Sequence, residues 1–329
     1  MTTSFATFGN ELYTGKRSYN FVDSKKIWFI IAAVAVALSI LIPVLKGGFN
    51  LGIEFRGGSE FTVSNVKTTD AGLGEKAVHD VVSGAIPRVA NVAGNTMRIQ
   101  TDQLTDDETN RIKEGLTTAY GVTDNEVTSN FVGPTWGQDV TRQALIGLVV
   151  FVGLAAVLMA LYFRTWKMSL SALVGMLVTM FTTAGVYALS DFEVTPSAII
   201  GFLTVLSYSL YDTVVVFDKI RENTAGISTS TRRTFGEEVN LAVNQTLVRS
   251  INTMMVAVLP VAAILFIGAG LLGAGTLRDL SLALFVGILI GTAATIFIAA
   301  PLYAWLRQGE PDLVKQAGKV AHRRAEATV

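Results

Sequence analysis

The sequence predicts a membrane protein built from an all-α bundle of six transmembrane helices and one α+β domain outside the membrane. Of its 329 residues, 50% are hydrophobic and 16% are charged, whereas a soluble domain carries roughly 25% charged residues. Six apolar stretches approach the length of about 20 residues that a membrane-spanning helix needs. The long polar segment between the first and the second of these stretches is large enough to form a domain.

The six predicted spans occur as one followed by five. The first, Ile27 to Leu45, is long for a signal peptide, and no small-residue cleavage pattern follows it, so we expect it to be retained. The other five are Leu145 to Phe163, Met168 to Leu189, Ser197 to Phe217, Ile251 to Leu272 and Leu280 to Leu306.

Lysines and arginines beside the spans predict the orientation, because such residues stay on the cytoplasmic side. They precede the first span, separate the second from the third, and follow the fourth and the sixth, which places all of them on one side. We therefore expect both termini to be cytoplasmic. The expected segments are cytoplasmic 1–26, transmembrane 27–45, extracytoplasmic domain 46–142, transmembrane helices 2 to 6 within 143–306 with a cytoplasmic loop at 219–248, and a cytoplasmic tail at 307–329.

Strand and helix patterns alternate inside the expected domain. Gly94 favours a hairpin turn at Asn91 to Asn95, and Thr105 followed by Glu108 predicts a capping box at a helix start. The resulting order is that of the split βαβ, ferredoxin-like arrangement. The predicted elements are strand Ser59 to Val66, helix Gly72 to Ser83, strand Arg88 to Val92, strand Thr96 to Thr101, helix Asp106 to Tyr120 and strand Glu126 to Phe131.

Composition argues against several classes of function. The chain has no cysteine and a formal net charge of zero, so it offers no thiolate chemistry and no basic footprint for nucleic acid. Its two histidines, His79 and His322, lie outside the apolar spans, which excludes a zinc-protease helix and a serine–histidine pair inside the membrane. We expect no enzyme, no metal site and no bound cofactor.

Asp212 is the most informative residue, because it lies inside the fourth span. A charged residue at the centre of a span costs about 2.5–3.5 kcal/mol, so such residues usually face a cavity or a partner. We expect Asp212 to point inward, about 8–10 Å from the cytoplasmic end of the helix near Asp218. Arg249 begins the fifth helix from the same side and could pair with Asp212 directly or through water. Desolvation and a guanidinium would act in opposite directions on the carboxyl, which suits reversible protonation.

Structural explanations compete with these functional ones. Arg249 could reach the interface at a helix start, and Asp212 could only hold helices together. Asp218 is expected at the interface, paired with Lys219 or Arg221. Arg232 to Gln245 has the pattern of an amphipathic helix at the cytoplasmic membrane surface or of a soluble connector.

Three segments carry a resemblance to a known family. They are Leu51 to Gly58 after the first span, Tyr211 to Glu222 at the end of the fourth, and Asn244 to Thr253 at the start of the fifth. Together they resemble the SecF family, the small subunits of the SecDF accessory complex of bacterial protein translocation. The layout of one span, an outer domain and five spans is similar to half of a resistance-nodulation-division (RND) transporter.

This resemblance implies a function in protein export driven by the proton motive force. A SecF-like subunit pairs with SecD, and the two use proton flow to help pull unfolded secretory polypeptides outward after the SecYEG channel. YidC and YajC are further expected partners, and SecA, which hydrolyses the ATP, would act on this chain indirectly. The resemblance also implies a location in the bacterial plasma membrane, with the lipid bilayer as surrounding solvent.

The resemblance assigns roles to particular residues. Asp212 and Arg249 align with the family's intramembrane charged positions implicated in proton passage, where the arginine is thought to interact with an aspartate of SecD. Ser209, Thr213 and Asp218 are the expected supporting residues.

A second motif follows the first span, where Glu54, Phe55, Gly57 and Gly58 are expected to have a structural role. The family commonly has aspartate where Glu54 stands, and the glycines suit a tight turn.

Two alternatives stay open. The chain could be a structural scaffold of a translocon, with intramembrane charges that only hold helices together. It could also be an RND-type proton-coupled exporter of small molecules, which the small outer domain disfavours.

Overall fold

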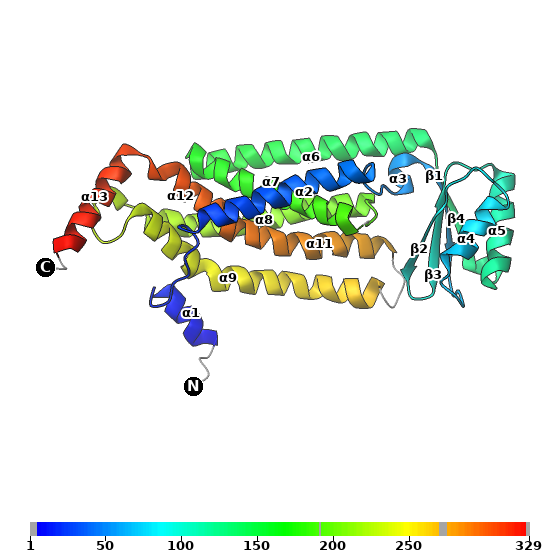
Figure 1. Ribbon diagram of the computed structural model, residues 1–329, viewed down its shortest axis with the longest axis horizontal. Coiled ribbons are helices and arrows are strands. Elements are labelled where there is room, and N and C mark those ends of the chain that lie inside the picture. Colours follow the sequence, from blue (N-terminus) through cyan, green and yellow to red (C-terminus); the bar gives the residue numbers. More distant parts are fainter. Residues whose placement is uncertain (1–4, 191, 270–274, 327–329) are drawn as a thin grey trace.

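The computed structural model describes residues 5–190, 192–269 and 275–326 as a long helical bundle with a small sheet domain at one end (Figure 1). We call this the domain end. Helices α1 (Phe5–Tyr13) and α13 (Pro311–Glu326) lie toward the opposite end, which we call the tail end. The last residues of the predicted fifth span, 270–272, lie outside the described residues.

Within the described residues, six helices are long and apolar enough to cross a membrane, as the sequence predicts. Two of them continue through a short π-helical stretch: η3 (Ile264–Ala269) extends the fifth span, and η4 (Thr295–Ala299) lies within the sixth. The helices are α2 (Lys25–Lys46), α6 (Pro134–Phe163), α7 (Trp166–Ser190), α8 (Pro196–Asn223), α9 (Phe235–Ala263) and α11 (Gly275–Ala294) with its continuation α12 (Ala300–Gln308).

Several helix boundaries differ from the prediction. Helix α6 begins at Pro134 rather than Leu145, because a proline at the first helical position starts the helix before its apolar part begins. Residues 134–142 therefore belong to a bundle helix and not to the outer domain. Helix α8 continues past Phe217 to Asn223, since its polar last turns stay helical beyond the apolar stretch.

The predicted cytoplasmic loop 219–248 is mostly helical. Helix α9 starts at Phe235 with a capping box of Thr234 and Glu237, so the connection after α8 shrinks to residues 224–234 with the single turn η2 (Ile227–Thr229). The predicted amphipathic helix is formed from Phe235 onward as the start of α9, but its apolar face is buried in the protein. Val239 and Ala242 are fully buried in a cluster with residues of the N-terminal segment, α12 and α13, because these elements cover the apolar face of the helix.

Helices α8 and α11 pack closely along a seam of small residues. A Cβ placed on Gly287 would meet Val205 at 2.5 Å, and one on Gly291 would meet Ser209 at 3.1 Å. This agrees with the expectation that small residues four apart let a neighbouring backbone approach. The contacts recur every four residues along both helices, at Gly201 with Ala283, Val205 with Gly287, Ser209 with Gly291 and Thr213 with Thr295.

The small domain contains a four-stranded antiparallel sheet with the strand order β2-β3-β1-β4. Strand β3 and helix α5 have the predicted bounds, and the capping box of Thr105 and Glu108 is formed. Strand β1 ends at Val63 rather than Val66, since Asn65 adopts a φ of 57°. The elements are β1 (Gly58–Val63), α4 (Ala71–His79), β2 (Arg88–Ala93), β3 (Thr96–Thr101), α5 (Asp106–Tyr120), η1 (Asp124–Glu126) and β4 (Val127–Val132).

The two faces of the sheet differ. Phe61, Met97 and Ile99 point to one side, where they form a core with α4 and α5 on the face away from the bundle (Figure 1). The alternate residues Arg98 and Gln100 contact the bundle. The domain thus has its own apolar core and turns a polar surface toward the membrane helices.

The chain enters and leaves the domain at one point. Gly57 and Gly58 have φ values of 79° and 132°, conformations that glycine adopts readily. A Cβ on Gly57 would lie 3.0 Å from the Cα of Pro134, where the chain returns to the bundle. The short helix α3 (Ile53–Arg56) precedes this crossing, so the glycines make the tight turn that the sequence predicts.

Candidate functional site

Asp212 is buried inside the bundle, as the sequence predicts. Only 3% of the residue is exposed, and its Oδ1 accepts a hydrogen bond of 2.8 Å from the hydroxyl of Ser250 on α9. Its Oδ2 is also buried and accepts no hydrogen bond from the described residues. Because α8 extends to Asn223, Asp212 lies about 16 Å from the end of the helix, while its distance from Asp218 stays as predicted.

Buried hydroxyl groups line the α8–α11 seam at residues near Asp212 in α8. The hydroxyl of Thr213 donates to the carbonyl of Ser209 and lies 2.8 Å from the hydroxyl of Thr295. The hydroxyls of Tyr208 and Thr292 are buried without a partner among the described residues. Ser209 and Thr213 are therefore part of the polar interior around Asp212.

The sequence interpretation missed Ser250, Thr292 and Thr295. Thr295 follows Gly291 by one helical turn and could have been found as a polar position on the small-residue face. Ser250 adjoins Arg249, and no pattern in the sequence distinguishes it from other serines near span ends.

Arg249 does not pair with Asp212 in this structure. Its side chain is exposed, while the next residue, Ser250, points inward and binds the acid. Successive residues of a helix diverge by about 100° around the axis, so Ser250 and Arg249 face different sides of α9. Arg249 thus adjoins the residue that binds the acid and is itself exposed.

The predicted pairing of Asp218 with Lys219 or Arg221 is wrong. Asp218 accepts a hydrogen bond of 2.7 Å from the hydroxyl of Tyr162 on α6. Lys219 pairs instead with Glu222 at 2.7 Å, because residues three apart share a helix face and adjacent residues do not. Arg221 is three residues from Asp218 but is exposed and forms no ion pair with it among the described residues. Asp218 therefore joins two helices at the bundle periphery.

Two asparagines of α9 hold the N-terminal segment against the bundle. The carboxamide of Asn244 accepts from the backbone N–H of Tyr19 at 2.7 Å and donates to its carbonyl at 2.8 Å. Asn240 accepts from the N–H groups of Phe21 and Val22. These contacts give Asn244, within one of the three family-like segments, a physical role that the sequence did not reveal.

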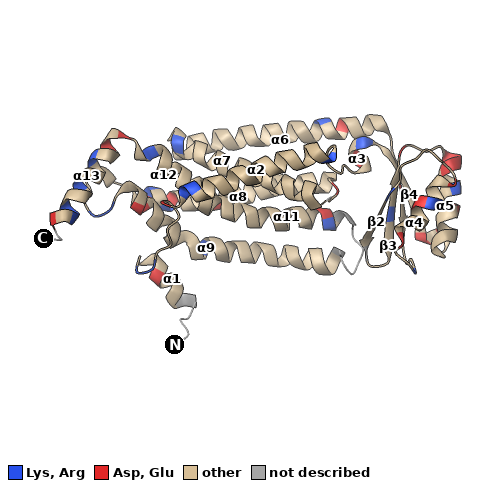
Figure 2. Cartoon of the chain, viewed as in Figure 1, with Lys and Arg blue, Asp and Glu red and all other residues tan. Residues whose placement is uncertain are grey.

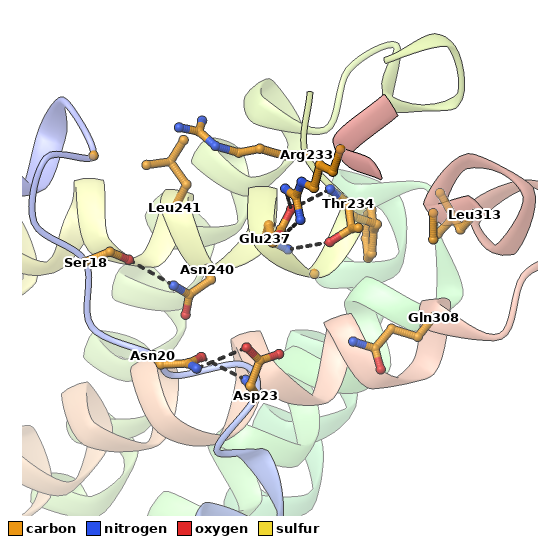
Figure 3. A pocket seen from close by; sticks show the side chains of 15 residues that line it. Ser18, Asn20, Asp23, Arg233, Thr234, Glu237, Asn240, Leu241, Gln308 and Leu313 are labelled. Atoms are coloured by element: carbon orange, nitrogen blue, oxygen red, sulfur yellow. Dashed lines mark hydrogen bonds and ion pairs between the residues drawn. The ribbon is translucent and has the colours of Figure 1, made fainter. Parts of the chain in front are cut away.

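A cavity of about 630 Å³ lies beside this segment at the tail end. Figure 3 shows Ser18 bonded to Asn240 and Asn20 bonded to Asp23 at its edge. Its walls mix acidic, basic and apolar side chains, so their charge favours no single class of ligand. In the wider view, Lys and Arg gather around α12 and α13 while the middle of the bundle is largely uncharged (Figure 2).

Comparison with known families identifies the chain. A model described as "Protein export membrane protein SecD/SecF, C-terminal" matches residues 112–309, and one described as "SecD/SecF GG Motif" matches residues 45–64, which include Gly57 and Gly58. The chain belongs to the SecD/SecF family. Within this family, the glycine pair for which the motif is named is the crossing point described above.

Two relatives that match nearly the whole chain are SecF proteins. The chain is 40% identical to the protein translocase subunit SecF of Streptomyces coelicolor, over 98% of this chain and 86% of that protein. It is also 40% identical to SecF of Mycobacterium tuberculosis, over 97% of this chain and 74% of that protein. The expected membership of the SecF family and the multi-pass membrane architecture are thereby confirmed.

A solved relative has the same fold. The crystal structure of SecDF from Thermus thermophilus, described as a translocon-associated membrane protein, matches with a TM-score of 0.75 at 27% identity. The match covers 89% of this chain but 39% of that one, so this chain corresponds to about two fifths of SecDF. The names of these relatives place the chain among protein transport subunits, and they indicate no catalytic activity.

Proposed function

We propose that this chain is a SecF-type subunit that promotes protein export, and that Asp212 takes up and releases the protons that drive it. The observation that carries this proposal is the state of the Asp212 carboxylate. One oxygen is held by Ser250 and the other has no partner among the described residues. A carboxylate that is buried, bonded on one side and free on the other is suited to accept a proton.

Protonation would change the forces between the helices that meet at the acid. A buried charge in a membrane protein is unfavourable by about 2.5–3.5 kcal/mol, and neutralisation removes that cost. The bond to Ser250 links α8 to α9, and the seam links α8 to α11. Uptake of a proton therefore alters the balance between two packings of these helices.

A partner subunit would complete the site. Helix α9 buries little of its membrane-spanning surface, and Arg249 lies exposed on it. In SecDF proteins, such as that of Thermus thermophilus, the region equivalent to this chain is joined to a larger one. We propose that SecD covers this face and supplies an acid to Arg249, and that the pair works with SecYEG, YidC and YajC on unfolded secretory chains, with SecA acting indirectly.

The distribution of charge supports the proposed orientation. Basic side chains gather at the tail end (Figure 2), which would be cytoplasmic by the positive-inside tendency. The small domain would then be extracytoplasmic. Its order of strands and helices, with the sheet order β2-β3-β1-β4, supports a ferredoxin-like arrangement.

Asp212→Asn tests the proposed function. Asparagine keeps the shape and the bond to Ser250 but cannot carry a proton, so proton-stimulated export of a secreted reporter should be lost while the membrane level of the chain is unchanged. Asp218→Asn is the matched control, because it removes an acid of the same helix that lies at the periphery. Undiminished export by the Asp212→Asn variant would overturn the proposal.

The scaffold alternative has its own support, because the bonds Ser250–Asp212 and Thr213–Thr295 hold helices together. A scaffold should tolerate Asp212→Asn, which preserves a polar group, and should lose assembly with Asp212→Ala. Copurification of SecD with each variant separates this function from proton coupling.

A further inference from the structure

The domain and the bundle meet through polar contacts. None of the buried apolar clusters among the described residues joins the sheet domain to the membrane helices: the domain core stays within residues 61–127. Arg98 of β3 donates to Glu193, in the connection between α7 and α8, at 2.7 Å. Gln100 donates to the same carboxylate at 2.5 Å, and Arg278 of α11 donates to the carbonyl of Val92 at 2.6 Å.

Four carboxylates, those of Glu54, Glu60, Glu193 and Asp279, interact at this junction with three arginines, Arg98, Arg56 and Arg278. Arg98 also lies 3.7 Å from Glu60 of β1, and the side chains of Arg98, Glu60 and Glu193 are each less than a fifth exposed. Asp279, at the start of α11, accepts from the hydroxyl of Thr195 at 3.1 Å and adds a further negative charge that acts on Arg98. A half-buried group of this composition is unfavourable unless a proton neutralises part of it.

Glu54 is the carboxylate placed to receive that proton. It lies in α3, and both its Oε2 and the Oε1 of Glu193 lie against Gly52. No described side chain hydrogen-bonds to the Glu54 carboxylate. Burial raises the pKa of the Glu54 carboxyl, and the charges of Glu193 and Glu60 act in the same direction, while its own backbone N–H and Arg98 oppose them.

We propose that Glu54 is a proton-operated lock between the small domain and the bundle. Protonated Glu54 lets Glu193 and Glu60 remain beside Arg98, and the domain stays docked. Ionised Glu54 repels both acids, weakens the contacts of Arg98 and Gln100, and frees the domain to turn about the crossing at Gly57 and Pro134. This device goes beyond the proton site proposed at Asp212 and does not depend on it.

Docking depends on pH because the docked and the released forms bind the Glu54 proton with different affinity. Burial makes the docked form hold the Glu54 proton more firmly than a released form with Glu54 in water, so docking is favoured at low pH and weakens as the pH rises through the raised pKa. An acidic exterior would therefore keep the domain docked.

Spin-label distances measure docking directly. The chain has no native cysteine, so Thr118→Cys on α5 and Leu189→Cys on α7 give two unique label sites, both at exposed positions. In the full-length chain in lipid nanodiscs, we expect a narrow distance distribution in acidic buffer that broadens in alkaline buffer, as the pH rises through the raised pKa of Glu54.

Variants identify the responsible group. The distance distribution of Glu54→Gln, which cannot ionise, should stay narrow at both pH values. The distribution of Arg98→Gln should be broad at both. Glu75→Gln removes an exposed acid of α4 and should behave as the unmodified chain does, and so should Asp212→Asn. The lock would be overturned if the distance distribution of the unmodified chain did not change with pH. It would also be overturned if the distribution of Glu54→Gln still broadened. Loss of the response in Asp212→Asn would show that the junction follows the membrane site and would equally contradict it.

Discussion

The hydroxyl of Ser250 donates a hydrogen bond of 2.8 Å to the carboxylate of Asp212. The two residues lie on different membrane helices, α9 and α8, and the bond is fully buried. The acid on which the proposed function depends is thus held by a neutral hydroxyl, next in sequence to the exposed Arg249. This relationship gives the site a partner that can bind both the charged and the protonated acid.

Ser250→Ala should impair export more than it impairs stability. Hydrogen bonds between membrane helices contribute about 0.6 kcal/mol on average, so unfolding in detergent should shift little. The charged form of Asp212 would lose the hydrogen bond that Ser250 donates. We therefore expect slower proton release and a clear loss of proton-stimulated export. Ser207→Ala, which removes an exposed hydroxyl bonded to its own helix, should leave both measurements unchanged.

Gly287→Val should disrupt the seam between α8 and α11. The added atoms would meet Val205 at 2.5 Å, and overpacking of this kind destabilises by about 1–3 kcal/mol. The expected result is a lower midpoint of thermal unfolding in detergent. Gly147→Val on α6 is the control, since a Cβ there meets nothing within 4 Å; equal midpoints for the two variants would refute close packing at the seam.

Asn244→Ala should release the N-terminal segment from α9. It removes the donor and the acceptor that bind the backbone of Tyr19, and a typical hydrogen bond contributes about 0.5–1.5 kcal/mol. Hydrogen exchange at residues 18–22 should accelerate. Asn20→Ala, whose side chain bonds only to nearby Asp23, should not accelerate exchange at Tyr19 in the same experiment.

The hydrogen bonds of the Glu126 carboxylate predict a local loss of stability in acid. Its carboxylate accepts from the N–H and hydroxyl of Thr123 and from the carboxamide of Asn65, and these bonds lower its pKa. Because the folded-state pKa is depressed, the stabilisation is present above the unfolded value of about 4.3 and is lost as the pH falls through the folded value. Hydrogen exchange of the Thr123–Val127 turn should rise in acid, and Glu126→Gln should remove that dependence.

Periodicity and capping signals predicted most of the fold. The bounds of β3 and α5 were correct because a hairpin glycine and a capping box mark them locally. The start of α6 at Pro134 and the extension of α8 to Asn223 were missed, since helix continues past the end of the apolar pattern. The apolar pattern marks the part of a helix that lies in the membrane, whereas the hydrogen-bonded helix extends beyond that part.

The candidate site was only partly visible in the sequence. Asp212 could be found because an acid in an apolar span is costly. Its partner Ser250 could not, because the rotation of α9 against α8 decides whether residue 249 or 250 faces inward, and this depends on packing between segments far apart in the chain. The carboxylates around Arg98 come from four separate segments, so no local pattern could have joined them.

The crossing of Gly57 and Pro134 attaches the domain to the membrane helices through a single small region of backbone. A polypeptide that pulled on the sheet would exert torque about that region, since no second covalent connection among the described residues resists rotation. Mechanical load on the domain would therefore pass to α6 and, through the contacts of Arg98 and Arg278, to the starts of α8 and α11. The weakest of these connections would set the largest force that the domain can transmit.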